Sequence, residues 1–272
     1  MDRRSLHQLN RKVMLDTQRQ CGSNEELIQA VKHSIEHQYM VDEERVIDLP
    51  VVACHTKFIV SPKRSFEAAK GYPGKKVAVL NFANNHSVGG SPFSAGAQEE
   101  SLCRCSTLYP CLQAMKDSFY RKHQRQYEQG IINYVGNDDI IYTPDVIVFK
   151  SDERTEIIEP KMLPRDEWYK VNIITCAAPE LRFGPMPNDY ETIITTRIKR
   201  ILDVAAMERT EVLILGAWGC GAFRNPTETV AHVFFTLLKN YNFETVEFAI
   251  ISDRMMKIFA DECAKMDSSQ NV

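Results

Sequence analysis

The sequence contains no uninterrupted apolar run that approaches the ~20 residues of a membrane-spanning helix. Its first residues, Met1 to His7, also lack the apolar core of a signal peptide. Cysteine is sparse, with eight among 272 residues, which is too few for a scaffold held together by disulfide bonds. We therefore expect a cytoplasmic protein whose cysteines are reduced thiols.

An excess of positive charge is missing as well. The chain has 33 Lys and Arg against 36 Asp and Glu, which gives a formal net charge of −3. Without a basic field, bulk attraction to nucleic acid or to an anionic membrane is not expected. The chain has no internal repeat and no long Gly/Ser linker, and at 44% hydrophobic residues it can bury a full core. These features indicate one large globular domain, alone or with an appendage, and we expect a monomer.

The N-terminal part, residues 1–46, is polar and has the pattern of two helices. The second helix begins at Ser23–Glu26, where a small polar residue can cap it. Its apolar residues recur at helical spacing: Leu27, Ile28, Val31 and Ile35. We expect residues 1–46 to form an N-terminal helical extension and residues 47–272 to form the main domain.

From about residue 50 onward, short apolar runs alternate with helical segments. Six runs are predicted to be strands: Val51–Ile59, Val77–Phe82, Ile140–Phe149, Val171–Cys176, Val212–Leu215 and Val246–Ile251. Several are apolar throughout, as strands covered on both faces should be. Two helix starts are marked by a polar cap followed by Glu, at Asn188–Glu191 and at Asn225–Glu228, where Pro226 takes the first helical position. The alternation predicts a three-layer α/β/α sandwich with a mixed sheet.

Two glycine-containing loops each join a predicted buried strand to a helix. The first holds Gly89, Gly90 and Gly96, and the second runs from Gly216 to Asn225. In open α/β sheets, ligands bind at the carboxyl ends of strands, where glycines expose backbone N–H groups and helix starts favour phosphate. Neither loop has the spacing of a P-loop or of Gly-x-Gly-x-x-Gly. The pair favours a diphosphate-containing ligand over two ordinary tight turns.

Three segments together resemble the signature of microbial-type poly(ADP-ribose) glycohydrolases. They are Asn81–Asn84, Gly89–Ser91 and Gln98–Glu100, and six residues, Pro92 to Ala97, separate the second from the third. The loop from Gly216 likewise resembles the phosphate-binding loop of that family. The resemblance covers nearly the whole α/β part and implies a macrodomain-like fold.

The resemblance implies a glycosidase that cleaves the ribosyl bond of poly(ADP-ribose) or of ADP-ribosylated targets and releases ADP-ribose. Such a bond breaks through an oxocarbenium-like state, so a carboxyl group must protonate the leaving oxygen. Adjacent residues of a helix do not share a face, so Glu99 and Glu100 should differ in role. By resemblance, Glu100 is the acid/base and Glu99 orients the distal ribose. The alternative is that both only favour the first turn of a helix.

The resemblance also implies a set of ligand-binding residues: Asn84, Gly89, Gly90, Ser91, Gln98, Pro179, Gly219, Cys220, Gly221, Ala222 and Phe223. Asn84 would bind the distal ribose, although an Asn after a strand is also a common turn former. Residues 219–222 would cradle the diphosphate, and Phe223 would stack near the distal ribose or else pack in the core. Pro179 belongs to a segment that resembles the adenine-side loop.

One position departs from the family pattern. The third glycine of the family triplet is Ser91 here, and Pro92 follows it. Serine disfavours a positive φ, and proline has no N–H with which to bind a phosphate. The departure slightly favours a second hypothesis, a non-catalytic module that binds ADP-ribose.

A third hypothesis is a hydrolase of a free nucleotide-sugar or acylated ADP-ribose that uses the same pocket. None of the three hypotheses requires a cofactor. No metal site is predicted either, because His33 and His37 lie four residues apart without an evident third ligand. The expected partner is ADP-ribose or an ADP-ribosylated macromolecule, and no membrane.

Overall fold

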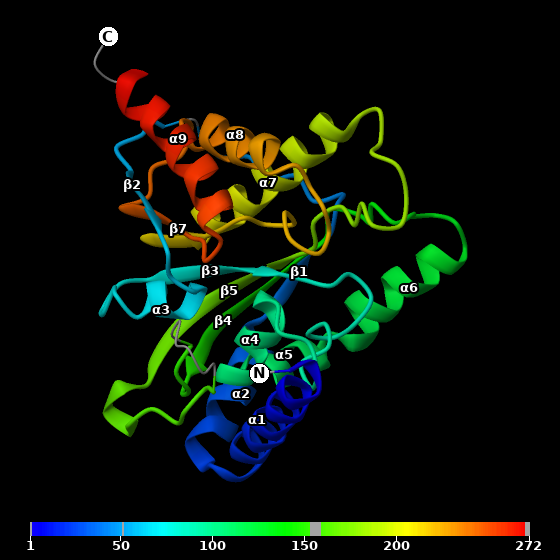
Figure 1. Cartoon of the computed structure of the whole chain (residues 1–272), viewed down its shortest axis with the longest axis vertical. Helices are drawn as coiled ribbons and strands as arrows, with labels where there is room; N and C mark the ends of the chain where they lie inside the picture. The colour runs from blue at the N-terminus through cyan, green and yellow to red at the C-terminus, as the bar shows by residue number, and fades with distance from the viewer. Residues whose placement is uncertain (1, 51, 153–158, 270–272) are drawn as a thin grey trace.

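A computed structural model describes residues 2–50, 52–152 and 159–269, and a mixed sheet of seven strands runs through this part of the chain (Figure 1). The strand order is β1-β4-β5-β3-β6-β7-β2. The strands are β1 (Tyr39–Val41), β2 (Lys57–Ser61), β3 (Val77–Phe82), β4 (Ile140–Val148), β5 (Tyr169–Cys176), β6 (Val212–Leu215) and β7 (Thr245–Ala249). Strands β5, β3, β6, β7 and β2 pair in parallel, whereas β4 is antiparallel to both β1 and β5. The predicted mixed sheet is confirmed.

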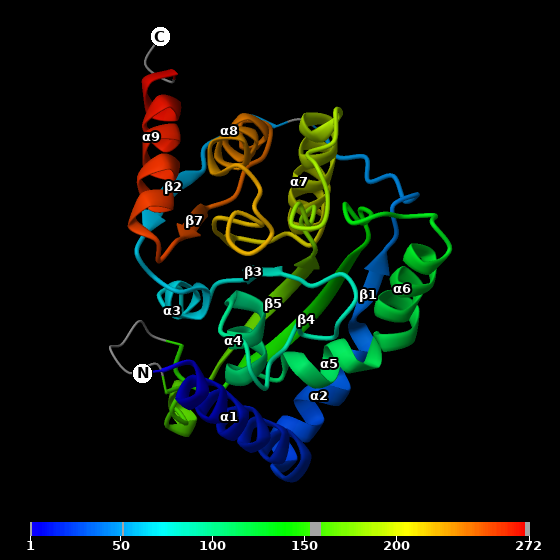
Figure 2. The ribbon, with the colours of Figure 1, turned by 45° about the vertical axis from the view of Figure 1, so that its right-hand side comes forward.

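Helices cover both faces of the sheet, as apolar strands require (Figure 2). One face carries α7 (Tyr190–Met207), α8 (Thr227–Leu238) and α9 (Asp253–Ser269). The other carries α3 (Ser65–Ala69), α4 (Gln98–Cys105) and α5 (Leu108–Ala114). Successive residues of β3 alternate between the two cores, Ala78 and Leu80 on one side and Val77 and Val79 on the other. The predicted three-layer sandwich is therefore confirmed.

The N-terminal helices lie beside α4 and α5 (Figure 2). They are α1 (Arg3–Ser23) and α2 (Glu25–His37), and Asn24 caps α2 by accepting hydrogen bonds from the N–H groups of Glu26 and Leu27. Helix α1 packs on α4, and α2 packs on β4 and α5. The proposed division at residue 46 stays a prediction, but this segment already contributes the edge strand β1 to the sheet.

The remaining helical segments lie beside the sheet. They are the π-helical turn Lys116–Tyr120, helix α6 (Arg121–Glu128) and the short 3-10 turn Arg165–Glu167. Across the described ranges, none of the helices combines the length and apolarity needed to cross a membrane.

One strand prediction was wrong in its bounds, and one strand was missed. The strand expected at Val51–Ile59 begins at Lys57 and extends to Ser61, because the parallel register with β7 pairs Lys57 with Thr245 and Ser61 with Ala249. Residue 51 lies outside the described residues. The short edge strand β1 was not predicted at all, since three residues carry too little periodicity to be recognised.

The capping prediction for α8 was also wrong. The helix begins at Thr227, with Pro226 in the capping position and no side-chain cap. The Asn225 side chain is used elsewhere, donating hydrogen bonds to the carbonyl oxygens of Pro179 and Gly219 at 2.8 and 3.0 Å. The polar side chain before α8 therefore hydrogen-bonds to loop carbonyl groups and does not cap the helix.

A buried lysine fastens α1 to the sheet. Lys150 is 2% exposed, and its Nζ donates to the carbonyl oxygen of Val13 at 3.1 Å and to Oγ1 of Thr17 at 2.8 Å. The same Nζ pairs with Oδ2 of Asp16 at 2.8 Å. Three contacts to one helix turn make α1 part of the folded unit.

We predict that Lys150→Met lowers the free energy of unfolding by about 1–3 kcal/mol, because charge-assisted hydrogen bonds in a buried place are lost. Urea denaturation followed by circular dichroism measures the change. Lys257→Met, at an exposed position of α9, is the control and should stay within about 0.5 kcal/mol of wild type. Equal stability of Lys150→Met and the control would show that α1 is only loosely attached.

Candidate active site

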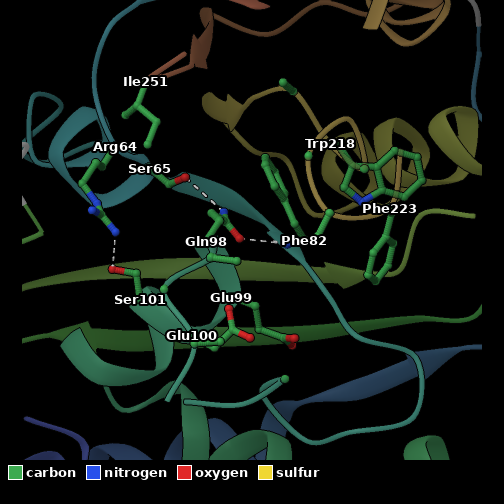
Figure 3. Close-up of a pocket in the computed structure, with 18 of the residues that line it drawn as sticks. Arg64, Ser65, Phe82, Gln98, Glu99, Glu100, Ser101, Trp218, Phe223 and Ile251 are labelled. Atoms are coloured by element: carbon green, nitrogen blue, oxygen red, sulfur yellow. Dashed lines mark hydrogen bonds between the residues drawn. The ribbon is translucent and has the colours of Figure 1, made fainter. Parts of the chain in front are cut away.

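A cavity of about 480 Å³ opens at the carboxyl ends of β3, β6 and β7, in the size range of a nucleotide ligand. Figure 3 shows its lining, with Glu99 and Glu100 on α4 facing loops that follow the strands. Gly90 of the first glycine loop and Gly221 of the second both line it. The two loops therefore meet at one edge of the sheet, as predicted from their place after parallel strands.

Most of the predicted site residues line this one cavity. They are Asn84, Gly90, Ser91, Gln98, Glu99, Glu100, Gly219, Gly221, Ala222 and Phe223. Three predicted residues, Gly89, Pro179 and Cys220, are not part of the lining. Each of these three is instead next in sequence to a residue that does line the cavity, namely Gly90, Ala178 or Gly221.

The contacts of these three residues explain their position. A Cβ on Gly89 would lie 2.9 Å from Sγ of Cys103, so this glycine packs against α4. The carbonyl oxygen of Pro179 accepts a hydrogen bond from Asn225. Cys220 is 7% exposed, and burial raises the pKa of its thiol to about 12, so it is a poor nucleophile.

Gln98 joins the start of α4 to the end of β3. Its Oε1 accepts from the N–H of Phe82 at 2.9 Å, and its Nε2 donates to Oγ of Ser65 at 3.0 Å (Figure 3). The same Nε2 donates to the carbonyl oxygen of Leu80 at 2.7 Å. Both ends of the amide are thus engaged within the protein. Gln98 positions the two glutamates that follow it.

Glu99 is 3% exposed and accepts a hydrogen bond on each oxygen. The N–H of Asn84 donates to Oε2 at 2.8 Å, and Nδ2 of Asn81 donates to Oε1 at 3.2 Å. Burial raises the pKa of Glu99 to about 8 despite these donors, and the neighbouring Glu100 charge adds to the rise. The geometry suits a carboxyl group that is held in place rather than one that moves.

Glu100 is held on one side only. Its Oε1 accepts from the N–H of Ser91 at 3.0 Å, whereas its buried Oε2 has no hydrogen-bond partner among the described residues. Gly90 lies so close that a Cβ there would sit 2.5 Å from Oε1. One carboxyl oxygen is therefore fixed while the other is available to a ligand.

Asn84 performs the turn-forming role that was the alternative to ribose binding. Its Oδ1 accepts from the N–H groups of His86 and Ser87 at 2.9 and 2.8 Å. The residue still lines the cavity, and its own N–H supports Glu99. The turn and a contact with a ligand are compatible, because Nδ2 of Asn84 is not used by the turn.

The departure at Ser91 and Pro92 does not distort the loop. Positive φ angles occur at Gly89 and Gly90, at 64° and 67°, and Ser91 is not among the residues with a positive φ. The N–H of Ser91 is the one that reaches Glu100. Serine therefore satisfies what this position requires, which is an N–H in an ordinary backbone conformation.

Buried groups hold the second loop together. Gly219 has a φ of 73°, and a Cβ there would lie 2.4 Å from Cβ of Ala178. Trp218 is fully buried and its Nε1 donates to the carbonyl oxygen of Cys176 at 3.0 Å. Oδ1 of Asn225 accepts from the hydroxyl of Tyr190 at 2.9 Å. The tie at Asn225 links this loop to α7.

Sequence reasoning missed a polar cluster in the cavity wall beside Glu100. Arg64 contacts Asp152 through Nε at 2.8 Å and donates from Nη2 to Oγ of Ser101 at 2.7 Å (Figure 3). The Ser101 hydroxyl in turn donates to Asp152 at 2.7 Å. No sequence signal could have found the cluster, since its members lie 37 and 51 residues from Ser101.

A second missed residue, Arg182, lines the opposite part of the wall. Its guanidinium pairs with Glu180 and lies over the rings of Phe183 and Phe223 at 5.2 and 5.4 Å. Contacts of a guanidinium with aromatic faces orient its plane. Phe223 is thus in contact with a cation on one side.

No cluster of three or more His, Cys, Asp or Glu suited to a metal ion occurs within the described ranges. The rings of His33 and His37 lie 4.3 Å apart between centroids and are tilted by 36°, and Nε2 of His33 contacts Asp145. The wall of the cavity contains the carboxyl groups of Glu99 and Glu100 and backbone of both glycine loops.

Comparison with known proteins gives a consistent result. Residues 9–151 match the family described as microbial-type PARG, catalytic domain, where PARG is poly(ADP-ribose) glycohydrolase. The crystal structure of the Thermomonospora curvata enzyme bound to the inhibitor ADP-HPD is similar with a TM-score of 0.79 and 27% identity, covering 93% of this chain and 98% of that one. The Deinococcus radiodurans enzyme in complex with ADP-ribose has a TM-score of 0.76 and 27% identity, covering 87% and 97%. No curated protein sequence matches.

We predict that Glu99→Gln flattens the dependence of stability on pH. A carboxyl whose pKa rises from 4.5 in the unfolded chain to about 8 in the folded one binds its proton more tightly when folded. Its contribution is therefore full below pH 4.5 and is lost as pH rises toward 8. Gln stays neutral at every pH. The buried Oδ1 of Asn81 has no hydrogen-bond partner among the residues that the structure describes, and after a flip of the Asn81 amide it can accept from the Gln side chain.

Urea denaturation between about pH 5 and 9 measures this effect. The free energy of unfolding of Glu99→Gln minus that of wild type should grow as the pH increases. Glu128→Gln, an exposed carboxyl on α6, is the control and should run parallel to wild type. Parallel curves for Glu99→Gln would contradict the raised pKa.

Proposed function

This chain belongs to the microbial-type PARG family, and from that premise we propose that it hydrolyses the ribosyl glycosidic bond of poly(ADP-ribose) or of ADP-ribosylated targets, with Glu100 as the general acid/base. The observation that carries the proposal is the state of Glu100. One oxygen is fixed by the Ser91 N–H, and the other is buried and has no hydrogen-bond partner within the described part of the chain. Such an oxygen can approach the leaving oxygen of a substrate.

The reaction needs one proton transfer in each direction. Glu100 donates its proton to the leaving oxygen as the C1–O bond of the distal ribose breaks, and the ring develops oxocarbenium character. The carboxylate then takes a proton from the water that adds to the anomeric carbon. One water is consumed, ADP-ribose is released, and Glu100 returns to its starting protonation state.

Glu99 is proposed to orient the distal ribose. Its two hydrogen bonds to Asn81 and Asn84 keep it still, and a raised pKa favours a neutral carboxyl that can donate to a ribose hydroxyl. Glu99 and Glu100 thus take different roles because their surroundings differ. Asn84 is proposed to contact the same ribose with its free Nδ2.

The diphosphate is proposed to lie between the two glycine loops. Ser91 with Gly90 on one side and residues 219–222 on the other present backbone to the cavity, which favours phosphate without a metal. Phe223, whose ring contacts the guanidinium of Arg182, is proposed to pack beside the ribose. Gly89, Gln98, Pro179 and Cys220 support these loops.

The cellular compartment, the binding partner and the oligomeric state are also part of the proposal. All eight cysteines are free, which supports a reducing compartment such as the cytoplasm. The net charge of −3 supports recognition of the ADP-ribose group rather than bulk binding to nucleic acid. We propose a monomer on the macrodomain-like fold.

The decisive experiment compares wild type with Glu100→Gln on poly(ADP-ribose) and on mono-ADP-ribosylated protein, with free ADP-ribose as the measured product. Gln keeps the size of Glu but has no transferable proton. Turnover should fall by about 10²–10⁴-fold, the usual contribution of a general acid–base group. Calorimetry with ADP-ribose should show little change in affinity, because the lost interaction belongs to the transition state.

Two outcomes would contradict the proposal. A wild-type chain that binds ADP-ribose tightly but releases none from either substrate would be a binding module. An active Glu100→Gln variant would assign the proton transfer to another group. AMP, which lacks the distal ribose and one phosphate, is the control ligand and should bind more weakly than ADP-ribose.

A further prediction separates the two neighbouring positions of the first glycine loop. Gly90→Ala should lower turnover at least about 100-fold, because the added Cβ would displace Glu100 and the residue has a φ of 67°. Ser91→Gly keeps the backbone N–H and should retain wild-type activity or exceed it. Rates on poly(ADP-ribose) decide the matter, and similar losses in both variants would mean that the Ser91 side chain itself is required.

A further inference from the structure

We propose that Asn10 of helix α1 is a positioning residue for Glu100, acting through the loop Ser91–Ala97. The inference rests on the proposed function, because it assigns a part in the same proton transfer to the N-terminal helix. Asn10 is not itself part of the cavity lining, and it lies more than 80 residues before the loop that it holds.

Asn10 makes two hydrogen bonds to the backbone of the loop. Its side chain is buried, with the residue 4% exposed, and Nδ2 donates to the carbonyl oxygens of Ser94 and Ala95, both at 3.0 Å. Loop carbonyl groups that are removed from water need such donors. The two bonds fix the outer side of the loop, while Ser91 and Ala95 line the cavity on its inner side.

Helix α1 is a firm support for this contact. Asn10, Val13, Met14 and Thr17 are buried at helical spacing on one face of the helix. Oγ1 of Thr17 donates to the carbonyl oxygen of Arg104 on α4 at 2.5 Å. The helix that carries Asn10 is therefore attached to the helix that carries Glu100.

The loop transmits the position of Asn10 to Glu100. The carbonyl oxygen of Ser91 accepts from the N–H groups of Ser94 and Ala95 at 3.0 and 2.9 Å, so these residues form one tight turn. The N–H of Ser91 in turn is the donor to Oε1 of Glu100 at 3.0 Å. A shift of the turn therefore moves the group that holds the carboxyl.

Arg104 provides a second tether to the same turn. Its Nη1 donates to the carbonyl oxygens of Pro92 and Ala95 at 2.9 and 2.7 Å. Because this tether remains when Asn10 is replaced, the loop should stay folded but less firmly placed. The expected consequence is a loss of catalytic geometry rather than a loss of the site.

The test compares three variants of the full-length chain. Asn10→Ala removes both hydrogen bonds. Asn10→Asp keeps the shape but replaces the donor with an oxygen that faces two carbonyl oxygens. Asn24→Ala is the matched control, since Asn24 caps α2 and does not touch the loop. Turnover on poly(ADP-ribose), calorimetric affinity for ADP-ribose and thermal stability are measured for each variant.

Asn10→Ala should lower kcat by about 10- to 100-fold, as a misplaced catalytic group does, with a much smaller change in ADP-ribose affinity. Asn10→Asp should be impaired at least as strongly as Asn10→Ala, because the donor and not the volume is required. Asn24→Ala should keep its kcat even where its melting temperature falls. Wild-type turnover in Asn10→Ala, or recovery of turnover in Asn10→Asp, would overturn the proposal.

Hydrogen exchange provides a readout that does not depend on activity. The amides of Ser91 and of residues 93–97 should exchange faster in Asn10→Ala than in wild type, whereas those of β3 should not change. A wild-type chain without hydrolytic activity would defeat the proposed function, and the exchange data would still decide whether Asn10 tethers the loop. Unchanged exchange of the loop amides would show that it does not.

Discussion

The amide of Gln98 makes the contact on which the candidate site depends. It bonds to the end of β3 through Phe82 and Leu80 and to α3 through Ser65. An amide carries both a donor and an acceptor, so one side chain can satisfy the last backbone groups of a strand and fix the start of a helix. The next two residues of that helix are Glu99 and Glu100. Their place at the cavity follows from this junction between strand and helix.

Two adjacent carboxyl groups reach different states because their hydrogen bonds differ. Glu99 has a donor on each oxygen and is more deeply buried, and its pKa is raised because desolvation outweighs those donors. Glu100 accepts one hydrogen bond, and its second oxygen has no partner in the described part of the chain. A static carboxyl and an available carboxyl are thus produced side by side, which is how a pair of acids is adapted to separate roles.

The N-terminal helices take part in the same unit as the sheet. Lys150 donates a hydrogen bond to the backbone of α1, and Asn10 of α1 donates one to the loop whose Ser91 N–H holds Glu100. Burying a lysine or an asparagine costs free energy unless every hydrogen bond is made, so such contacts define one arrangement of the helix and not several. The segment can therefore influence the site without lining it.

The sequence alone determined the α/β alternation, the two glycine loops at strand ends and the Gln98–Glu100 motif, because each depends on residues that are neighbours in the chain. It also indicated ten of the cavity residues through a family resemblance. It could not identify Arg64, Asp152 or Arg182, and it assigned Asn225 to a helix cap instead of a loop tie.

Only the tertiary structure decided these points, together with the start of β2 and the edge strand β1. The start of β2 is set by register with β7, more than 180 residues later in the chain. The partner of Asn10 is a pair of carbonyl oxygens more than 80 residues away. Hydrogen bonds between distant segments leave no periodic trace in a sequence, since any Asn or Arg of suitable reach could make them. Local pattern therefore determines the elements and their loops, and packing between elements determines which polar side chains meet.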